Sequence, residues 1–457
     1  NKDGSFHTTF RYRGPDLESS TQEELVSIMA RVNNVLRRFG SGWALFFEAQ
    51  RSEVHDYPES EFPIAAAWLV DEERALQAED AGARFQSNYY LTLLWLPPAD
   101  ATGKAEKALI TRPETIEAEG WPQRLETFQQ HAARVYDLLS TCLAEITPLD
   151  DDGTLTYLHS TVSSKRHPVV TPELPVFLDA ILADEPFTGG LEPMIGEAHL
   201  RTLTILGFPA STLPGILDEL NRQGFSYRWA TRFIAMDKAE AEKLLSKRRR
   251  HWFAKRKSVS TVLRETLFNE QAALVDNDAD NKASDADAAL QELGSDLVSF
   301  GYVTTTITVA HEDARMVDEH LRIAERIING RGFTAIRETL NAVEAWLGSL
   351  PGHAYANVRQ PILHTLNLAH MVPLSAVWAG EETNDHLSAP ALIQAQTDGT
   401  TPFRLNLHVG DVGHSLVVGP TGAGKSVLLS MLALQWQRYD EAQVFVFDKG
   451  RSARAAT

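Results

Sequence analysis

The residues whose spacing points most clearly to chemistry lie near the end of the sequence. Gly419 is followed by four residues and then by Gly424, Lys425 and Ser426, which gives the spacing G-x-x-x-x-G-K-S. Glycines permit backbone conformations that let consecutive N–H groups point at phosphate oxygens. A lysine in this place neutralises β- and γ-phosphates, and a serine hydroxyl binds Mg²⁺. The spacing predicts a phosphate-binding loop, and we expect its ligand to be ATP with Mg²⁺.

The sequence on both sides of the loop predicts the strand–loop–helix context that such a loop requires. Ser415–Val418 is a short apolar stretch that predicts a strand, and Val427–Trp436 is apolar nearly all round, as in a helix beside a sheet. The N-terminus of that helix would add partial positive charge next to the phosphates. Lys425 and Ser426 would act in catalysis, with Ser426 as the Mg²⁺ ligand. The residues expected to bind the nucleotide are Gly419, Pro420, Thr421, Gly422, Ala423, Gly424, Lys425, Ser426 and Val427.

A second apolar stretch, Val444–Phe447, predicts another strand, and it ends at Asp448. An acid in this place resembles the Walker B acid that helps to hold Mg²⁺. Asp448 follows Lys425 by only 23 residues, which leaves room for one helix and one turn. We therefore expect a neighbouring parallel strand near the nucleotide, with the Walker B interpretation as the alternative. Without a later acid, catalytic base or arginine finger, we expect this chain to bind nucleotide without hydrolysing it alone.

Composition restricts the class of protein. A chain of 457 residues with 43% hydrophobic residues fits a soluble protein of two or three domains, and no run reaches the ~18 apolar residues of a membrane span. The net charge of −18 argues against a surface that is devoted to nucleic acid. A single cysteine, Cys142, excludes an intramolecular disulfide and indicates a reducing compartment. Because the sequence starts at Asn1 and stops at Thr457 without a closing element, we expect a piece of a longer protein.

The basic run at 247–257 and the histidines do not identify a further site. The run Lys247–Lys257 holds seven Lys and Arg residues and is either a solvated helix face or a docking patch for nucleic acid, acidic lipid or a partner subunit. The fifteen histidines show no spacing that is typical of a metal site, so we predict no second metal centre.

The region ahead of the loop predicts alternating strands and helices. The expected strands are Phe6–Arg13, Trp43–Ala49, Tyr89–Leu96, Leu200–Phe208, Phe225–Met236 and Gly301–Ala310. The expected helices are Thr21–Arg38, about Phe62–Phe85, Trp121–Ile146, Leu213–Gln223, Ala239 to about Leu297, His311–Asn329 and Phe333–Leu347.

The order strand–helix–strand–helix–strand occurs twice, which predicts an α+β domain of two similar halves. We expect this N-terminal domain at 1–378, a linker at 379–401, and the start of a RecA-like α/β P-loop NTPase domain at 402–457.

Several segments resemble one known family. "NKDGSFHTTFRYRGPDL" from Asn1, "GSGWALFFEAQR" from Gly40 and "YYLTLLWLPPAD" from Tyr89 resemble the N-terminal domain of the TrbE-type conjugative-transfer ATPases of type IV secretion systems, as does "FPIAAAWLVDEER". "TPFRLNLHVGDVGHSLVVGPTGAGKS" and "FVFDKGRSAR" resemble the start of that family's RecA-like motor.

The resemblance implies a P-loop ATPase that energises pilus assembly and DNA or protein transfer. It also implies a homo-hexamer on the cytoplasmic face of the bacterial inner membrane, with peripheral membrane association and contacts to other secretion-channel and inner-membrane subunits. Direct contact with nucleic acid stays open. Two alternatives remain: a P-loop DNA translocase of the coupling-protein or FtsK type, and an assembly scaffold whose conformation is set by nucleotide.

Overall fold

The computed structural model describes residues 1–16, 19–54, 57–97, 120–209, 211–256, 289–291, 293–397 and 399–449, with the side chains of 248–256 left out. Within it the chain divides into two compact units. Unit 1 comprises Asn1–Gln50, Asn88–Leu220 and Tyr227–Ala376. Unit 2 comprises Arg51–Ser87, Asn221–Ser226 and Val377–Thr457. The architecture is α+β, as predicted.

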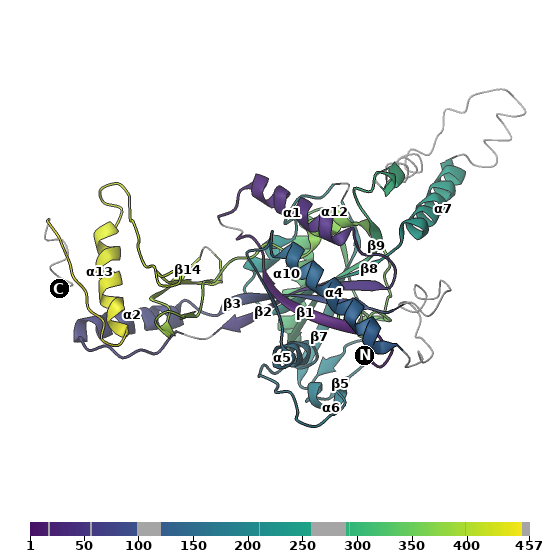
Figure 1. Cartoon of the computed structure of the whole chain (residues 1–457). Helices are drawn as coiled ribbons and strands as arrows, with labels where there is room; N and C mark the ends of the chain where they lie inside the picture. The colour runs from purple at the N-terminus through teal and green to yellow at the C-terminus, as the bar shows by residue number, and fades with distance from the viewer. Residues whose placement is uncertain are drawn as a thin grey trace, which may run out of the picture. The chain divides into compact units, whose positions relative to one another are not determined.

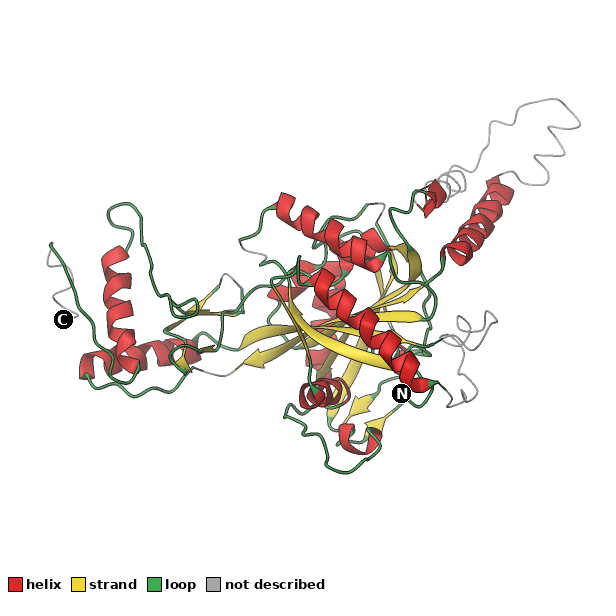
Figure 2. Cartoon of the chain, in the orientation of Figure 1, coloured by secondary structure: helices red, strands yellow, loops and turns green. Residues whose placement is uncertain are grey.

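Unit 1 is built on a large sheet that has eleven strands among the described residues (Figures 1 and 2). Its strand order is β4-β1-β3-β2-β8-β9-β7-β6-β5, with β10 paired to β7 and β11 paired to β9. The pairs β1–β3, β7–β9 and β8–β9 are antiparallel. The strands are β1 (Phe6–Arg13), β2 (Trp43–Val54), β3 (Arg84–Trp95), β4 (Glu145–Pro148), β5 (Phe187–Thr188), β6 (Met194–Ile195), β7 (Ala198–Gly207), β8 (Tyr227–Ala235), β9 (Phe300–His311), β10 (Thr334–Arg337) and β11 (Ile362–His364).

The helices of unit 1 follow the rules of capping and apolar spacing. They are α1 (Gln22–Leu36), α4 (Trp121–Leu139), α5 (Asp151–Val162), α6 (Asp179–Leu182), η1 (Asp218–Arg222), α7 (Lys238–Arg256), α10 (Ala314–Gly330), α11 (Ala342–Leu347) and α12 (Thr365–Met371). Thr21 and Glu24 form a reciprocal capping box at the start of α1. On α10 the buried positions Val317, Leu321 and Ile328 recur on one face, which the helix packs against the sheet.

All six strands predicted ahead of the loop are confirmed, but three of the predicted helices of unit 1 are wrong in part. The stretch 213–223 contains only the 3₁₀ segment η1, since Gly215 adopts a φ of 68° that breaks a regular helix. Residues 334–337 form strand β10 because they pair with β7, so only α11 of the predicted helix 333–347 is helical. The predicted helix 121–146 ends at Leu139, and β4 follows because it pairs with β1.

The remaining predictions for unit 1 are confirmed or lie partly outside the described residues. Cys142 is buried. The predicted helix from Ala239 is present as α7, and 257–288 lie outside the described residues. For the basic run Lys247–Lys257, nothing is described beyond the backbone of α7 and the side chain of Lys247.

Unit 2 is smaller. Its described elements are α2 (Ala65–Asp80), β12 (Thr383–Asn384), β13 (Ala389–Pro390), β14 (Ile393–Gln396), β15 (Pro402–Leu405), α13 (Lys425–Gln435) and η2 (Trp436–Arg438). The predicted helix 62–85 is shorter than expected because the backbone from Arg84 onward enters β3. The β14–β15 hairpin carries a small core formed by Leu392, Ile393 and Tyr439, against which Met431 of α13 packs.

Two strands predicted in unit 2 are absent from the structure. Neither Ser415–Val418 nor Val444–Phe447 is assigned to a strand, and their apolar side chains reach 88% exposure at Leu416 and 99% at Phe447. An extended segment becomes a strand only when a neighbour pairs with its backbone, and the described part of the chain supplies none here. Across the described residues, no helix combines the length and apolar character needed to cross a bilayer.

Candidate nucleotide site

The predicted phosphate-binding loop has an unusual backbone at two glycines. Gly422 and Gly424 have φ angles of 87° and 81°, in the left-handed region that side chains with a Cβ rarely adopt. Gly424 is also the N-cap of α13, so the loop turns directly into the helix. A Cβ placed on either glycine would meet no atom within 4 Å. The glycines are therefore required by backbone conformation, and the space beside them is open to a ligand.

The lysine of the motif lies over the loop. Lys425 Nζ donates hydrogen bonds to the backbone oxygens of Gly419 and Pro420, both at 2.7 Å. These contacts hold the ammonium group at the mouth of the loop, beside the N-terminal end of α13. Ser426 follows in the first turn and is exposed to solvent. Consecutive residues thus supply a cation, an exposed hydroxyl and the first N–H groups of a helix, a combination that suits a phosphate group with its metal ion.

The helix that follows the loop is anchored at its other end by a buried ion pair. Arg438 Nη2 lies 2.8 Å from Asp71 Oδ1 on α2, and the two side chains are 1% and 11% exposed. Arg438 Nη1 also donates to the Ala391 oxygen at 2.8 Å. The Tyr57 hydroxyl donates to the same Asp71 oxygen at 2.7 Å. Burial and this hydrogen bond raise the pKa of Tyr57 to about 12. This network fixes α2 against η2 and the end of α13 (Figure 1).

The arginine of α2, Arg74, contacts α13 directly. Arg74 Nη1 lies 3.1 Å from the sulfur of Met431, and Nη2 donates to the Gln394 oxygen of β14. Asp71 and Arg74 therefore connect α2 to both the helix and the hairpin. The sequence alone does not reveal these contacts, because Asp71 and Arg438 are 367 positions apart and charged residues on a helix usually indicate an exposed face.

The structure places the predicted loop residues in one loop and helix start, but it does not place Asp448 at the end of a strand. Gly419 to Val427 are consecutive, and their loop-and-helix arrangement is the one that the spacing predicts. Asp448 follows a stretch that is not a strand, so the interpretation of Asp448 as a strand-end residue is wrong in this respect.

Comparisons with known proteins place the chain in a family. The family model for the N-terminal domain of the type IV secretion system ATPases VirB4/TrbE matches residues 1–103. The model for the CagE, TrbE, VirB family, a component of type IV transporter systems, matches residues 253–359. A conjugal transfer protein TrbE of Rhizobium radiobacter is 36% identical over 100% of this chain and 57% of its own length. This chain belongs to the VirB4/TrbE family.

More distant relatives in the same family match over nearly the whole chain. The type IV secretion system protein virB4 of Bartonella quintana is 23% identical over 98% of this chain and 56% of its own length. The type IV secretion system protein PtlC of Bordetella pertussis is 24% identical over 97% of this chain and 55% of its own length. The chain spans about half the length of the curated relatives that it matches. The loop at 419–427 lies outside both family-model matches.

Proposed function

We propose that residues 419–427 of this VirB4/TrbE-family chain bind ATP with Mg²⁺, and that the complete protein uses ATP hydrolysis to energise type IV secretion. The observation that carries the proposal is the loop geometry. Gly422 and Gly424 have positive φ angles, and Lys425 lies over the loop at the start of a helix. Membership of a family of secretion ATPases agrees with this chemistry.

Each residue of the loop has a distinct role in the proposal. Backbone N–H groups from Gly422 to Lys425 would contact phosphate oxygens, and the open space beside Gly422 and Gly424 leaves room for them. Lys425 would exchange its two carbonyl partners for β- and γ-phosphate oxygens. The exposed hydroxyl of Ser426 is a hard oxygen ligand that fits Mg²⁺. When bound, Mg²⁺ would neutralise charge that develops on the phosphates.

The proposal also assigns the parts of the chain. Residues 402–457 would begin a RecA-like motor domain, and residues 1–378 would dock other secretion subunits. Residues 379–401 would link the two, as a connection that is itself folded into β12, β13 and β14 of unit 2. The sheet order supports two similar halves within the docking domain. Read from the outer strand toward the β2–β8 contact, the first half is β1-β3-β2 and the second is β7-β9-β8. In each half the first strand along the chain is therefore outermost, the third is in the middle and the second lies at the contact.

Partners and location follow from the family rather than from the site. We expect the complete protein to form a homo-hexamer, to contact other type IV secretion channel and inner-membrane subunits, and to associate peripherally with the cytoplasmic face of the inner membrane. The names of the relatives, a conjugal transfer protein and type IV secretion system proteins, motivate these expectations.

The test uses the complete protein purified as the wild type and as Lys425→Ala. We expect ATP turnover to fall at least about tenfold in the variant, since a charge-assisted contact to phosphate is worth roughly 1.5–3 kcal/mol. Lys449→Ala removes an equal charge from an exposed position after the helix and is the matched control. Equal turnover in the wild type and Lys425→Ala would contradict the proposal.

A further inference from the structure

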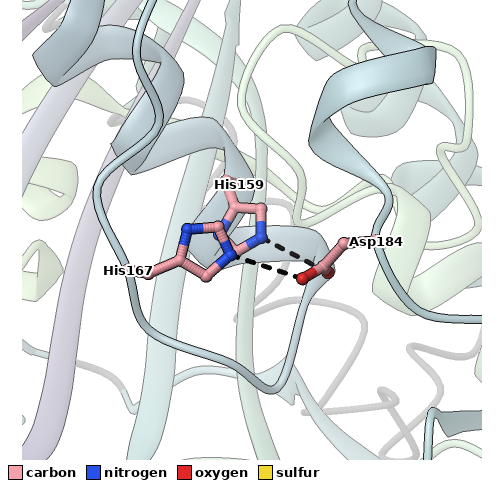
Figure 3. A group of neighbouring side chains, drawn as sticks. All are labelled: His159, His167 and Asp184. Carbon is pink, nitrogen blue, oxygen red and sulfur yellow. Dashed lines mark hydrogen bonds and ion pairs between the residues drawn. The ribbon is translucent and has the colours of Figure 1, made fainter.

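Two histidines and one aspartate of unit 1 converge at a point remote in sequence from the nucleotide loop. His159 lies on α5 and is fully buried, while His167 and Asp184 lie on the chain that follows this helix (Figure 3). His159 Nε2 is 3.3 Å from Asp184 Oδ1, and His167 Nε2 is 3.4 Å from Asp184 Oδ2. One ligand atom from each of the three side chains lies within 4.8 Å of the others.

The hydrogen bonding of His167 leaves a place for either a proton or a metal ion between its Nε2 and Asp184. Nδ1 of His167 is 3.1 Å from the Pro168 backbone oxygen, and a carbonyl can only accept, so Nδ1 carries the hydrogen. In the neutral ring Nε2 then holds a lone pair, and this lone pair faces a carboxylate oxygen. Two acceptors face each other unless a proton or a metal ion lies between them. A ring that donates through one nitrogen to a backbone carbonyl is also the usual second shell of a histidine metal ligand.

The spacing of the three side chains leaves them close enough to share one metal ion. With Zn–N and Zn–O distances of about 2.0–2.1 Å, the ligand atoms of a tetrahedral site are separated by roughly 3.3 Å. The nitrogen–oxygen distances of 3.3 and 3.4 Å are similar, with each nitrogen facing a different oxygen of the Asp184 carboxylate. Two imidazoles and one carboxylate are a donor set that suits zinc and related divalent transition metals.

We propose that His159, His167 and Asp184 bind one divalent transition-metal ion of the zinc class. The histidines coordinate through Nε2 and the aspartate through its carboxylate, and water occupies the fourth position. In the described part of the chain Nδ1 of His159 has no hydrogen-bond partner. Because a missing second-shell partner typically costs 10–100-fold in metal affinity, the site is weaker than one in which both rings are held.

The role of the ion would be structural, because it would fix the two ends of one loop against α5. His167 and Asp184 bracket the segment 168–183, which exposes Val170, Leu174 and Phe177 to solvent. The present contacts of this segment include bonds from Thr171 to Asp152, both exposed. A metal ion bound to both ends and to α5 would fix the two ends of this segment and so restrict the conformations open to it.

The test is zinc binding to the untagged chain after removal of metals with a chelator. We expect calorimetric titration with Zn²⁺ to give one site per chain. His167→Gln and Asp184→Asn each weaken that site at least about tenfold. His131→Gln, at an exposed histidine of α4, is the matched control and leaves the affinity unchanged. These variants alter exposed residues, and thermal unfolding in the presence of chelator confirms that they fold.

Two further readouts separate the proposal from a simple proton bridge. Co²⁺ bound at the site gives the visible absorption of a four-coordinate complex, which is lost in His167→Gln. Hydrogen exchange of 168–183 slows when Zn²⁺ is added to the wild type and does not change in that variant. The proposal is overturned if the wild type takes up no stoichiometric Zn²⁺, or if the ligand variants bind it as the wild type does.

Discussion

The buried Asp218 should make the unfolding free energy of unit 1 depend on pH, and the sign and size of this dependence follow from the structure. The side chain is 3% exposed and lies in η1. Burial raises the pKa of its carboxyl from 3.8 to about 7, against the lowering effect of the Ser375 hydroxyl. Folding therefore favours the protonated acid, and a charged Asp218 is a cost to the folded state at neutral pH.

The pH dependence follows from linkage. The folded pKa is raised, so the contribution of Asp218 to stability is fully present below the unfolded pKa, near 4, and is lost as the pH rises through about 7. The shift of about three units corresponds to about 4 kcal/mol at 1.36 kcal/mol per unit. Asp218→Asn removes this titration. Burying an amide without good partners costs about 1–3 kcal/mol, so the variant gains about 1–3 kcal/mol over the wild type at pH 8.

The assay is urea unfolding of the wild type and Asp218→Asn between pH 4 and pH 8, with hydrogen exchange of the β8 and β9 amides as the probe for unit 1. The difference in unfolding free energy should change by about 4 kcal/mol over this range in favour of the variant at high pH. Asp137→Asn, at an exposed position of α4, is the control for a changed surface charge. Parallel pH profiles for the wild type and Asp218→Asn would refute the reasoning.

Three other predictions concern single groups. Glu48→Gln removes the carboxylate that Arg228 contacts at 2.6 and 2.9 Å, and leaving this arginine buried should cost unit 1 about 3–5 kcal/mol in urea unfolding. Arg438→Gln leaves Asp71 without its buried partner and should lower the stability of unit 2 by a similar amount, measured by hydrogen exchange at α13. Gly424→Ala meets no atom within 4 Å, so its cost of roughly 1–2 kcal/mol is backbone strain, and nucleotide affinity should fall with it. Undiminished stability in the first two variants, or undiminished affinity in the third, would contradict these assignments.

Local patterns predicted a large part of the fold. The alternation in β1 and the apolar spacing in α10 are visible within a few residues, and each agrees with the element that forms. The predicted strands at 415–418 and 444–447 show the limit of such patterns, because pairing with a neighbour, and not apolar character, decides whether a strand forms. The 3₁₀ segment η1 replaced a predicted helix for a local reason, a positive φ at Gly215, that a helical pattern does not reveal.

The candidate sites also differ in how much of each the sequence alone reveals. The nucleotide loop is a run of consecutive residues, so its spacing identified it without a structure. The contact of Lys425 with Gly419 joins residues only six positions apart, whereas the pair formed by Asp71 and Arg438 joins residues 367 positions apart and depends on tertiary packing. His159, His167 and Asp184 have no motif spacing, and only the return of the chain against α5 brings them together.

The central claim is that residues 419–427 bind ATP with Mg²⁺, and equilibrium binding of a fluorescent ATP analogue to this chain tests it most directly. We predict saturable, Mg²⁺-dependent binding to the wild type and to Lys449→Ala. Loss of the charge-assisted contacts of Lys425, at roughly 1.5–3 kcal/mol, should weaken binding by Lys425→Ala about 10- to 150-fold. No saturable binding to the wild type, or equal affinity in Lys425→Ala, would contradict the account.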